Sequence, residues 1–288
     1  MKKIIALFLL VCGTVYGQAS YKGTLDIYPI ELVTHVYSDG PVNALYAYSK
    51  YDTPITINGE LKNRTLTLFE TNKAGDTIAN FTFTYFNTRA DVVHGLWTGN
   101  GKQLEVRLQK QFDLSEDEPE SQWYNRLLLM SGSTAKFYFK EELTRLKDDW
   151  TSRVTAVNIY EKGTDKLVQR IPVECQLWGI NAIQVGDFNF DGLEDFSVFE
   201  QSYAGANTSS LYFLFDKKTG QFFNSGFEGA TFDFDQEKKL VYEHNSCCMN
   251  TSVMNATYKV VNNKLVVVEK KCLQYDEATG DYKEINCD

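Results

Sequence analysis

Short runs of alternating apolar and polar residues, separated by turn residues, occupy most of this 288-residue chain. Such alternation places apolar side chains on one face of a β-strand, whereas a helix needs apolar residues three and four positions apart. The alternation is clearest in residues 65–69 (Thr-Leu-Thr-Leu-Phe) and 81–85 (Phe-Thr-Phe-Thr-Tyr). Turns are predicted between such runs, for example at Asn58-Gly59. We therefore predict an all-β protein.

The pattern divides the chain after its leader into three segments. Residues 18–112 are predicted to form an antiparallel β-barrel or sandwich domain. Residues 113–149 are predicted to be a linker with a short helix, because 114–121 is acidic and contains proline, while 141–147 (Glu-Glu-Leu-Thr-Arg-Leu-Lys) has helical character. Strand patterns return in residues 150–288, which we expect to form a second β domain.

Residues 1–17 have the composition of a cleaved export signal. Lys2 and Lys3 precede an apolar run that is too short to span a bilayer, and small residues follow that run. Val11 stands before Cys12, where a lipoprotein needs a small residue, so we expect cleavage rather than a lipid anchor. No later segment is apolar enough to cross a membrane. We therefore expect a periplasmic or extracellular protein without a membrane span.

The charge of the chain disfavours nucleic acid as a partner. Cleavage of residues 1–17 removes two lysines and no acidic residue, so the formal net charge of −9 becomes −11. Nucleic-acid binding needs a basic surface, whereas an acidic protein attracts cationic partners. The alternative is that the charge serves only to keep the protein in solution.

Residues 187–195 (Asp-Phe-Asn-Phe-Asp-Gly-Leu-Glu-Asp) place oxygen-bearing groups at alternate positions of a glycine-containing loop, as Ca²⁺ requires. The twelfth position, a glutamate in an EF-hand, is Val198, and both flanks are β-branched and aromatic. We therefore predict a strand–loop–strand calcium site with a structural role. A metal-free Asp/Asn/Gly turn is the alternative. The predicted ligands are the side chains of Asp187, Asn189, Asp191 and Asp195 and the carbonyl of Leu193.

Five cysteines remain after residue 17, and export to an oxidising compartment favours disulfides. Cys272 and Cys287 flank a turn and are predicted to pair. Cys175 is predicted to pair with Cys247 or Cys248, which leaves one cysteine over. A zinc site is disfavoured, because the chain has no paired C-x-x-C spacing and only three histidines.

A hairpin pattern, aromatic-Asp-x-x-Thr-Gly-x-aromatic, occurs at residues 215–222 and again at 275–282. Another hairpin is predicted within 258–268, with its turn at Asn262-Asn263. Successive hairpins indicate a meander of blade-like sheets, as in a β-propeller.

Residues 185–196 resemble the calcium loops of FG-GAP and integrin-type β-propeller repeats. The wider segment 154–268 resembles a family of bacterial exported proteins with a propeller-like calcium-binding domain, some of which are periplasmic immunity proteins that inhibit lysozyme-like cell-wall hydrolases. The resemblance implies a calcium-binding inhibitor and says nothing of residues 18–150. Outside the calcium loop it is carried by residues 168–171, 212–216, 232–235, 239–242 and 258–268.

The loop within residues 201–210 is the predicted partner-binding loop. Tyr203 would anchor it, Gly205 would give it freedom, and Asn207 would supply an amide. We expect Ca²⁺ to steady the base of this loop and so to lower the entropy cost of binding. The expected partner is a cationic, lysozyme-like hydrolase; the alternative is a glycan, bound by a surface or periplasmic adhesion module.

Catalysis is not expected. The sequence contains no G-x-S-x-G, H-E-x-x-H or phosphate-binding glycine motif, and its three histidines lie in no recognisable catalytic setting. A hydrolase that uses a carboxylate pair ranks behind both binding hypotheses, because acidic residues are abundant but no pair is identified.

Overall fold

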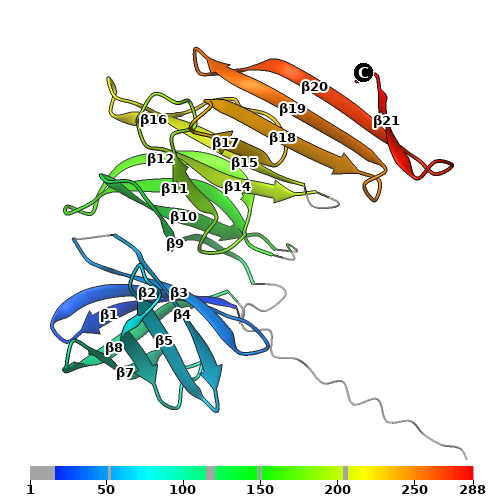
Figure 1. Ribbon diagram of the computed structural model, residues 1–288. Helices are drawn as coiled ribbons and strands as arrows, with labels where there is room; N and C mark the ends of the chain where they lie inside the picture. The colour runs from blue at the N-terminus through cyan, green and yellow to red at the C-terminus, as the bar shows by residue number, and fades with distance from the viewer. Residues whose placement is uncertain are drawn as a thin grey trace, which may run out of the picture. The chain divides into compact units, whose positions relative to one another are not determined.

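The computed structural model describes residues 17–50, 53–114, 121–147, 149, 151–203 and 207–287. Every regular element over these residues is a β-strand, which confirms the predicted all-β class (Figure 1). Within the same residues, no helix is long and apolar enough to cross a membrane. The predicted signal peptide lies outside the described residues, except for Gly17. The chain divides into two compact units, Met1–Tyr46 with Thr56–Asp117, and Ala47–Ile55 with Glu118–Asp288.

Eight strands close into a barrel in chain order, so the barrel, and not the sandwich, is the form of the first β domain. Closure depends on antiparallel pairing between the first and last strands, where Gly23 lies opposite Leu108. The strands are β1 (Gln18–Leu25), β2 (Tyr28–Val36), β3 (Pro41–Tyr48), β4 (Ile55–Lys62), β5 (Thr65–Thr71), β6 (Thr77–Phe83), β7 (Val92–Gly99) and β8 (Lys102–Asp113).

The predicted alternation builds the barrel interior. Leu66 and Leu68 of β5 are fully buried and lie opposite Phe83 and Phe81 of β6. Tyr46 of β3 meets Phe81 edge to face, with 5.1 Å between ring centroids. Residues two apart on one strand face the same side, so these side chains together fill the core.

The turn predicted at Asn58-Gly59 is wrong, because both residues lie within β4. The chain reverses instead at Asn63 and Arg64, whose φ angles are 50° and 63°. Gly59 serves a different purpose: a Cβ atom there would lie 1.9 Å from the Thr67 carbonyl oxygen. Glycine is therefore required for the close approach of β4 to β5.

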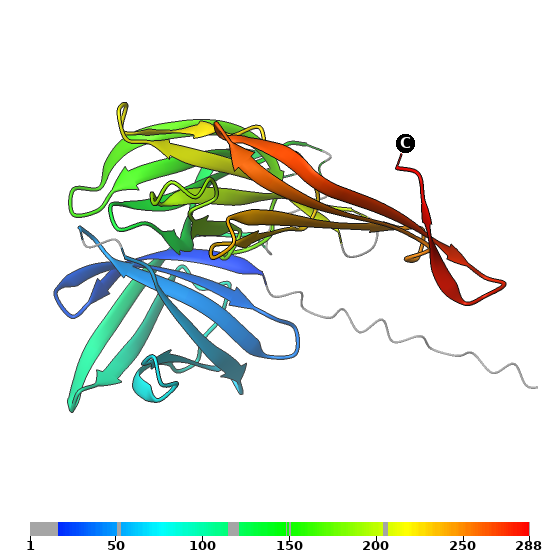
Figure 2. The same ribbon diagram turned by 45° about the horizontal axis from the view of Figure 1, so that its top comes forward.

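Over its described residues, the second unit contains three antiparallel sheets, and each is a meander whose strands follow chain order. Figures 1 and 2 both show the long strands of the third sheet extending together away from the first two sheets of this unit. The first sheet contains β9 (Trp123–Ser133), β10 (Phe137–Arg145), β11 (Arg153–Glu161) and β12 (Lys166–Gln176). The second contains β13 (Ile183–Gly186), β14 (Asp195–Ser202), β15 (Thr208–Asp216) and β16 (Gln221–Asn224). The third contains β17 (Phe232–Asp235), β18 (Leu240–Cys247), β19 (Ser252–Val261), β20 (Lys264–Asp276) and β21 (Asp281–Ile285).

The short helix predicted around residues 141–147 is wrong, because residues 137–145 form strand β10 within the segment 113–149. This strand is central: Glu141 pairs with Leu128 of β9 on one side and with Val157 of β11 on the other. Two neighbouring strands satisfy its backbone, and this tertiary pairing overrides the local helical preference of its residues.

The predicted hairpins are confirmed. The Gly220 N–H donates to the Asp216 carbonyl over 2.8 Å, and the Gly280 N–H donates to the Asp276 carbonyl over the same distance. Gly220 and Gly280 take left-handed φ angles of 70° and 74°. Asn262-Asn263 forms the β19–β20 turn with φ angles of 50° and 59°, as a two-residue hairpin loop of type I′ requires.

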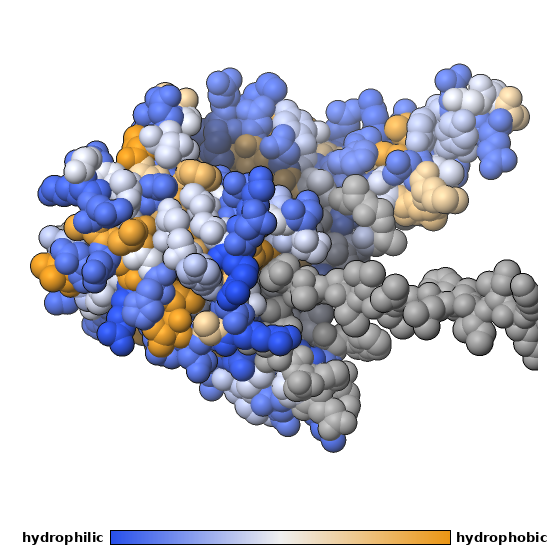
Figure 3. All heavy atoms as spheres, turned by 90° about the horizontal axis from the view of Figure 1, so that it is seen from below, coloured by the Kyte–Doolittle hydropathy of each residue, from blue (hydrophilic) through white to orange (hydrophobic). Residues whose placement is uncertain are grey.

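Aromatic side chains pack the three meanders together. The ring centroids of Phe139 in β10 and Phe196 in β14 are 4.8 Å apart, and this contact joins the first sheet to the second. The second and third sheets share a cluster of Phe188, Tyr212, Leu214 and Phe227 with Phe232, Phe234, Val260 and Leu265. On the face drawn in Figure 3, hydrophobic residues form separate patches among hydrophilic ones.

Candidate functional site

The Asp187 loop, residues 187–194, connects β13 to β14 and is curled by its own side chains. The Asp187 carboxylate accepts the N–H groups of Asp191 (3.0 Å) and Gly192 (2.7 Å). The Asn189 side-chain oxygen also accepts the Asp191 N–H, and the Asp191 carboxylate accepts the Leu193 N–H at 2.9 Å. Short polar side chains bonded to nearby backbone N–H groups stabilise such turns. The side-chain oxygens of Asp187, Asn189 and Asp191 therefore lie in one compact loop.

Asp195 lies at the start of β14 and is completely buried. One oxygen accepts the Phe188 N–H (2.9 Å) and the other accepts the Phe215 N–H (2.8 Å). Burial raises the pKa of Asp195 to about 6, Asp191 and Asp187 add to the rise, and the two backbone hydrogen bonds oppose it. Asp195 thus fastens the loop to β15.

The carboxylate and amide oxygens of the Asp187 loop are of the kind that Ca²⁺ binds. A carboxylate oxygen that accepts one N–H still has a lone pair for a hard cation. Within the described residues, however, no group of three or more His, Cys, Asp or Glu side chains is arranged to hold a metal ion. Calcium at the five predicted ligands therefore stays a prediction, and binding requires loop oxygens to turn toward the ion.

The Asp187 loop also contacts the third meander. The Asn189 amide donates to the Asn263 side-chain oxygen (3.0 Å), and the Gln236 amide donates to the Asp187 carbonyl (2.9 Å). The ring of Phe188 packs against that of Phe234, with 4.8 Å between their centroids. These contacts make the loop a junction between two sheets.

The predicted partner-binding loop connects β14 to β15. Asn207, at its far end, is buried: its amide donates to Asn245 Oδ1 (2.9 Å) and to the Ser246 carbonyl (2.6 Å), and its oxygen accepts the Ser246 N–H (3.1 Å). Asn207 is therefore a structural anchor, which corrects its predicted role as a partner contact. Tyr203 is 48% exposed, and its hydroxyl accepts the Gln201 amide at 2.8 Å. Gly205 lies outside the described residues.

The expectation that the calcium loop steadies the base of this second loop is wrong. Asp195 begins β14 and Ser202 ends it, so the two loops lie at opposite ends of one strand. At about 3.3 Å per residue, seven steps separate these ends by roughly 23 Å. The bonds between Asn207 and Ser246 hold the second loop instead.

The structure confirms one of the two predicted disulfides. Cys272 and Cys287 are bonded, with 5.3 Å between their Cα atoms. The second bridge, from Cys175 to Cys247 or Cys248, is not formed. Cys175 is buried on β12 of the first meander, whereas Cys247 and Cys248 are exposed at the end of β18 in the third.

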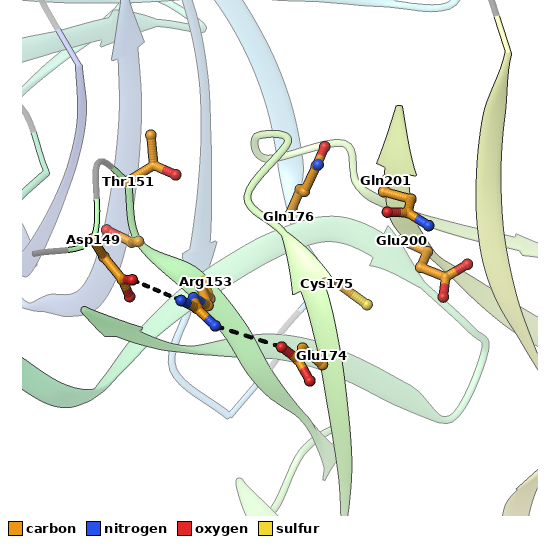
Figure 4. A pocket seen from close by; sticks show the side chains of 9 residues that line it. Asp149, Thr151, Arg153, Glu174, Cys175, Gln176, Glu200 and Gln201 are labelled. Carbon is orange, nitrogen blue, oxygen red and sulfur yellow. Dashed lines mark hydrogen bonds and ion pairs between the residues drawn. The ribbon is translucent and has the colours of Figure 1, made fainter. Parts of the chain in front are cut away.

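A pocket of about 350 Å³ lies beside Cys175 and was not predicted from the sequence (Figure 4). The Arg153 side chain crosses the pocket and forms ion pairs with Asp149 (2.6 Å) and Glu174 (3.5 Å). Burial, and then the nearby Glu141, Glu200 and Glu174, raise the pKa of the Cys175 thiol to about 12. The lining residues are Asp149, Thr151, Ser152, Arg153, Glu174, Cys175, Gln176, Glu200 and Gln201.

Glu141 lies close to this pocket in the core of the first meander. It is fully buried, neither carboxyl oxygen has a hydrogen-bond partner in the structure, and burial raises its pKa to about 8. At neutral pH both Glu141 and Cys175 hold their protons. A protonated buried thiol is an inert cysteine, so this pocket does not present an activated nucleophile.

No protein-family model matches the chain, and no curated protein matches it. Among solved structures, one described as a Xanthomonas type IV secretion system related protein matches at 12% identity, covering 94% of this chain and 99% of that chain, with a TM-score of 0.27. A likeness at that TM-score carries no argument. Fold and site together define an all-β protein with a closed barrel and three antiparallel meanders.

Proposed function

We propose that this chain is an exported, non-enzymatic binding protein that inhibits lysozyme-like cell-wall hydrolases. The observation that carries the proposal is the exposed side chain of Tyr203, whose backbone N–H donates to the carbonyl of Asn207 (3.0 Å), a residue fixed by its own buried amide. An aromatic anchor whose backbone is already held loses little entropy on binding. The net charge of −9 favours a cationic partner.

The three meanders are, in this proposal, blades of a propeller-like domain that calcium fastens. Each sheet keeps its strands in chain order, as blades do. Ca²⁺ would be held by the side chains of Asp187, Asn189, Asp191 and Asp195 and by the Leu193 carbonyl. Because the Asp187 loop contacts both the second and third meanders, the ion would strengthen their junction.

Inhibition of a panel of lysozyme-like hydrolases tests the proposed function. Tyr203→Ala should weaken inhibition about tenfold or more, since an anchor residue contributes more than about 1.4 kcal/mol to binding. Tyr85→Ala is the matched control, because Tyr85 is 79% exposed on the barrel. Absence of any complex between the wild type and every hydrolase at micromolar concentration would refute the proposal.

One observation favours a glycan-binding module as the second candidate. Trp178 is 58% exposed, and its ring stacks on Phe199 with centroids 4.4 Å apart. A tryptophan held flat by a second aromatic ring offers a rigid apolar face to a sugar. If this candidate is right, a glycan array will show bound sugars for the wild type and none for Trp178→Ala, while Tyr203→Ala will bind normally.

A further inference from the structure

Two adjacent cysteines lie at the tip of the β18–β19 hairpin. Cys247 ends β18 opposite Ser252 of β19, and Cys248 follows in the turn. Both are exposed, and their Sγ atoms are 2.7 Å apart. Their mutual hydrogen bond is the main cause that raises the pKa of the Cys248 thiol. The two sulfur atoms therefore already face each other at the surface.

The backbone of this tip is held in an uncommon conformation. Cys248, Met249 and Asn250 have consecutive φ angles of 59°, 57° and 64°. A non-glycine residue with positive φ is uncommon, and several in a row persist only where surrounding contacts impose them. Here the Thr251 hydroxyl donates to the Cys248 carbonyl (2.8 Å), and the Tyr282 hydroxyl donates to the Asn250 carbonyl.

The other cysteines in the described residues are not placed to react with this pair. Cys272 is bonded to Cys287, and Cys175 is buried with its pKa raised. An external disulfide has to reach a thiol in order to exchange with it, and burial denies Cys175 this access. Cys247 and Cys248 are thus the two accessible thiols of the described residues.

We propose that Cys247 and Cys248 are a redox site that forms a reversible disulfide between adjacent residues. The oxidant is a disulfide, either a small molecule or a protein. One cysteine thiolate attacks a sulfur of that disulfide, forming a mixed disulfide and releasing one thiol. The second cysteine then attacks the first, releasing the second thiol. Two electrons pass to the external disulfide, and the two protein protons leave with the released thiols.

This bond should be reduced more readily than Cys272–Cys287. Adjacent Cα atoms are about 3.8 Å apart across a trans peptide, below the usual span of about 4.4–6.8 Å in disulfides. The Cα atoms of Cys272 and Cys287 are 5.3 Å apart, within that span. Strained, exposed disulfides have the more oxidising potentials, which suits a reversible site.

Mass spectrometry after trypsin digestion tests the proposal on the full chain. Cys247 and Cys248 share the peptide 240–259, which contains no other cysteine. The protein is equilibrated in glutathione buffers of stepped redox potential, quenched in acid, unfolded and alkylated. We expect peptide 240–259 to change from two labels to none, with the loss of two hydrogens, as the buffer becomes oxidising. The linked peptides 272–283 and 284–288 should stay oxidised at potentials where 240–259 is already reduced.

Three variants complete the test. Cys175→Ser should leave the titration of peptide 240–259 unchanged, whereas Cys247→Ser and Cys248→Ser should each give one label in reducing buffer, a glutathione adduct on the remaining thiol in oxidising buffer, and at no potential the loss of two hydrogens. Two labels on the wild-type peptide across the whole series would overturn the proposal. A link between this peptide and the peptide that contains Cys175 would overturn it as well and would instead restore the bridge predicted from the sequence.

Discussion

Replacement of Glu141 by glutamine should remove a large part of the pH dependence of stability. The folded-state pKa of Glu141 is about 8, against an ordinary value of 4.5 in the unfolded chain. Below pH 4.5 both states hold the proton, so burial of the neutral acid carries no titration penalty. Between the two values only the unfolded chain releases the proton, and the free energy of unfolding falls as the pH rises. Above pH 8 both states release the proton, and the free energy of unfolding falls no further from this group.

The size of this effect follows from the shift. Each pKa unit corresponds to about 1.4 kcal/mol, so the shift from 4.5 to about 8 amounts to on the order of 5 kcal/mol. Between pH 5 and pH 8 the wild type should lose about 3.5 kcal/mol more than Glu141→Gln. Asp195, whose pKa is about 6, titrates in both proteins and cancels in the comparison.

Urea denaturation at pH 5 and at pH 8 measures the difference. The absolute stability of Glu141→Gln does not matter, because the comparison uses the change with pH. Glu277→Gln is the control, since Glu277 is an exposed turn residue, and it should keep the wild-type slope. Equal slopes in the wild type and in Glu141→Gln would refute the assignment of a protonated carboxyl to the core.

Three further substitutions test separate parts of the second unit. Asn207→Ala leaves the N–H and carbonyl of Ser246 without their partner and should cost about 1–3 kcal/mol in urea denaturation; unchanged stability would show that the anchor is absent. Leu214→Ala empties a fully buried position and should cost about 2–5 kcal/mol, and a smaller loss would contradict the packing of the second meander. The Arg170 guanidinium holds the pKa of Glu142 below its usual range. Arg170→Met should therefore destabilise the protein near pH 7, and this difference should shrink as the pH falls through the folded-state pKa of Glu142; a constant difference would exclude the ion pair.

The elements that the sequence predicts well are those whose cause is local. The turns after Asp216 and Asp276 depend on a glycine and an aspartate within five residues, and the pairing of Cys272 with Cys287 depends on one intervening hairpin. Turn chemistry of this kind can be read directly from a short window of sequence.

The features that the sequence missed depend on distant partners. Residues 141–147 have helical character in isolation, and pairing with β9 and β11 on either side makes residues 141–145 part of a strand. Barrel closure likewise requires β1 to find β8 some 80 residues later along the chain. The buried role of Asn207 depends on Ser246 in another sheet, and no local pattern reveals that contact.

The central claim is that the Asp187 loop binds calcium and fastens the second unit. Isothermal titration of Ca²⁺ into chelator-treated protein, with the melting temperature measured before and after, tests it most directly. The account predicts one calcium ion bound per chain by the wild type, with a rise in melting temperature, and neither effect in Asp191→Ala. Asp281→Ala, which removes an exposed aspartate of β21, should behave as the wild type does. No heat of binding and no change in melting temperature in the wild type would contradict the claim.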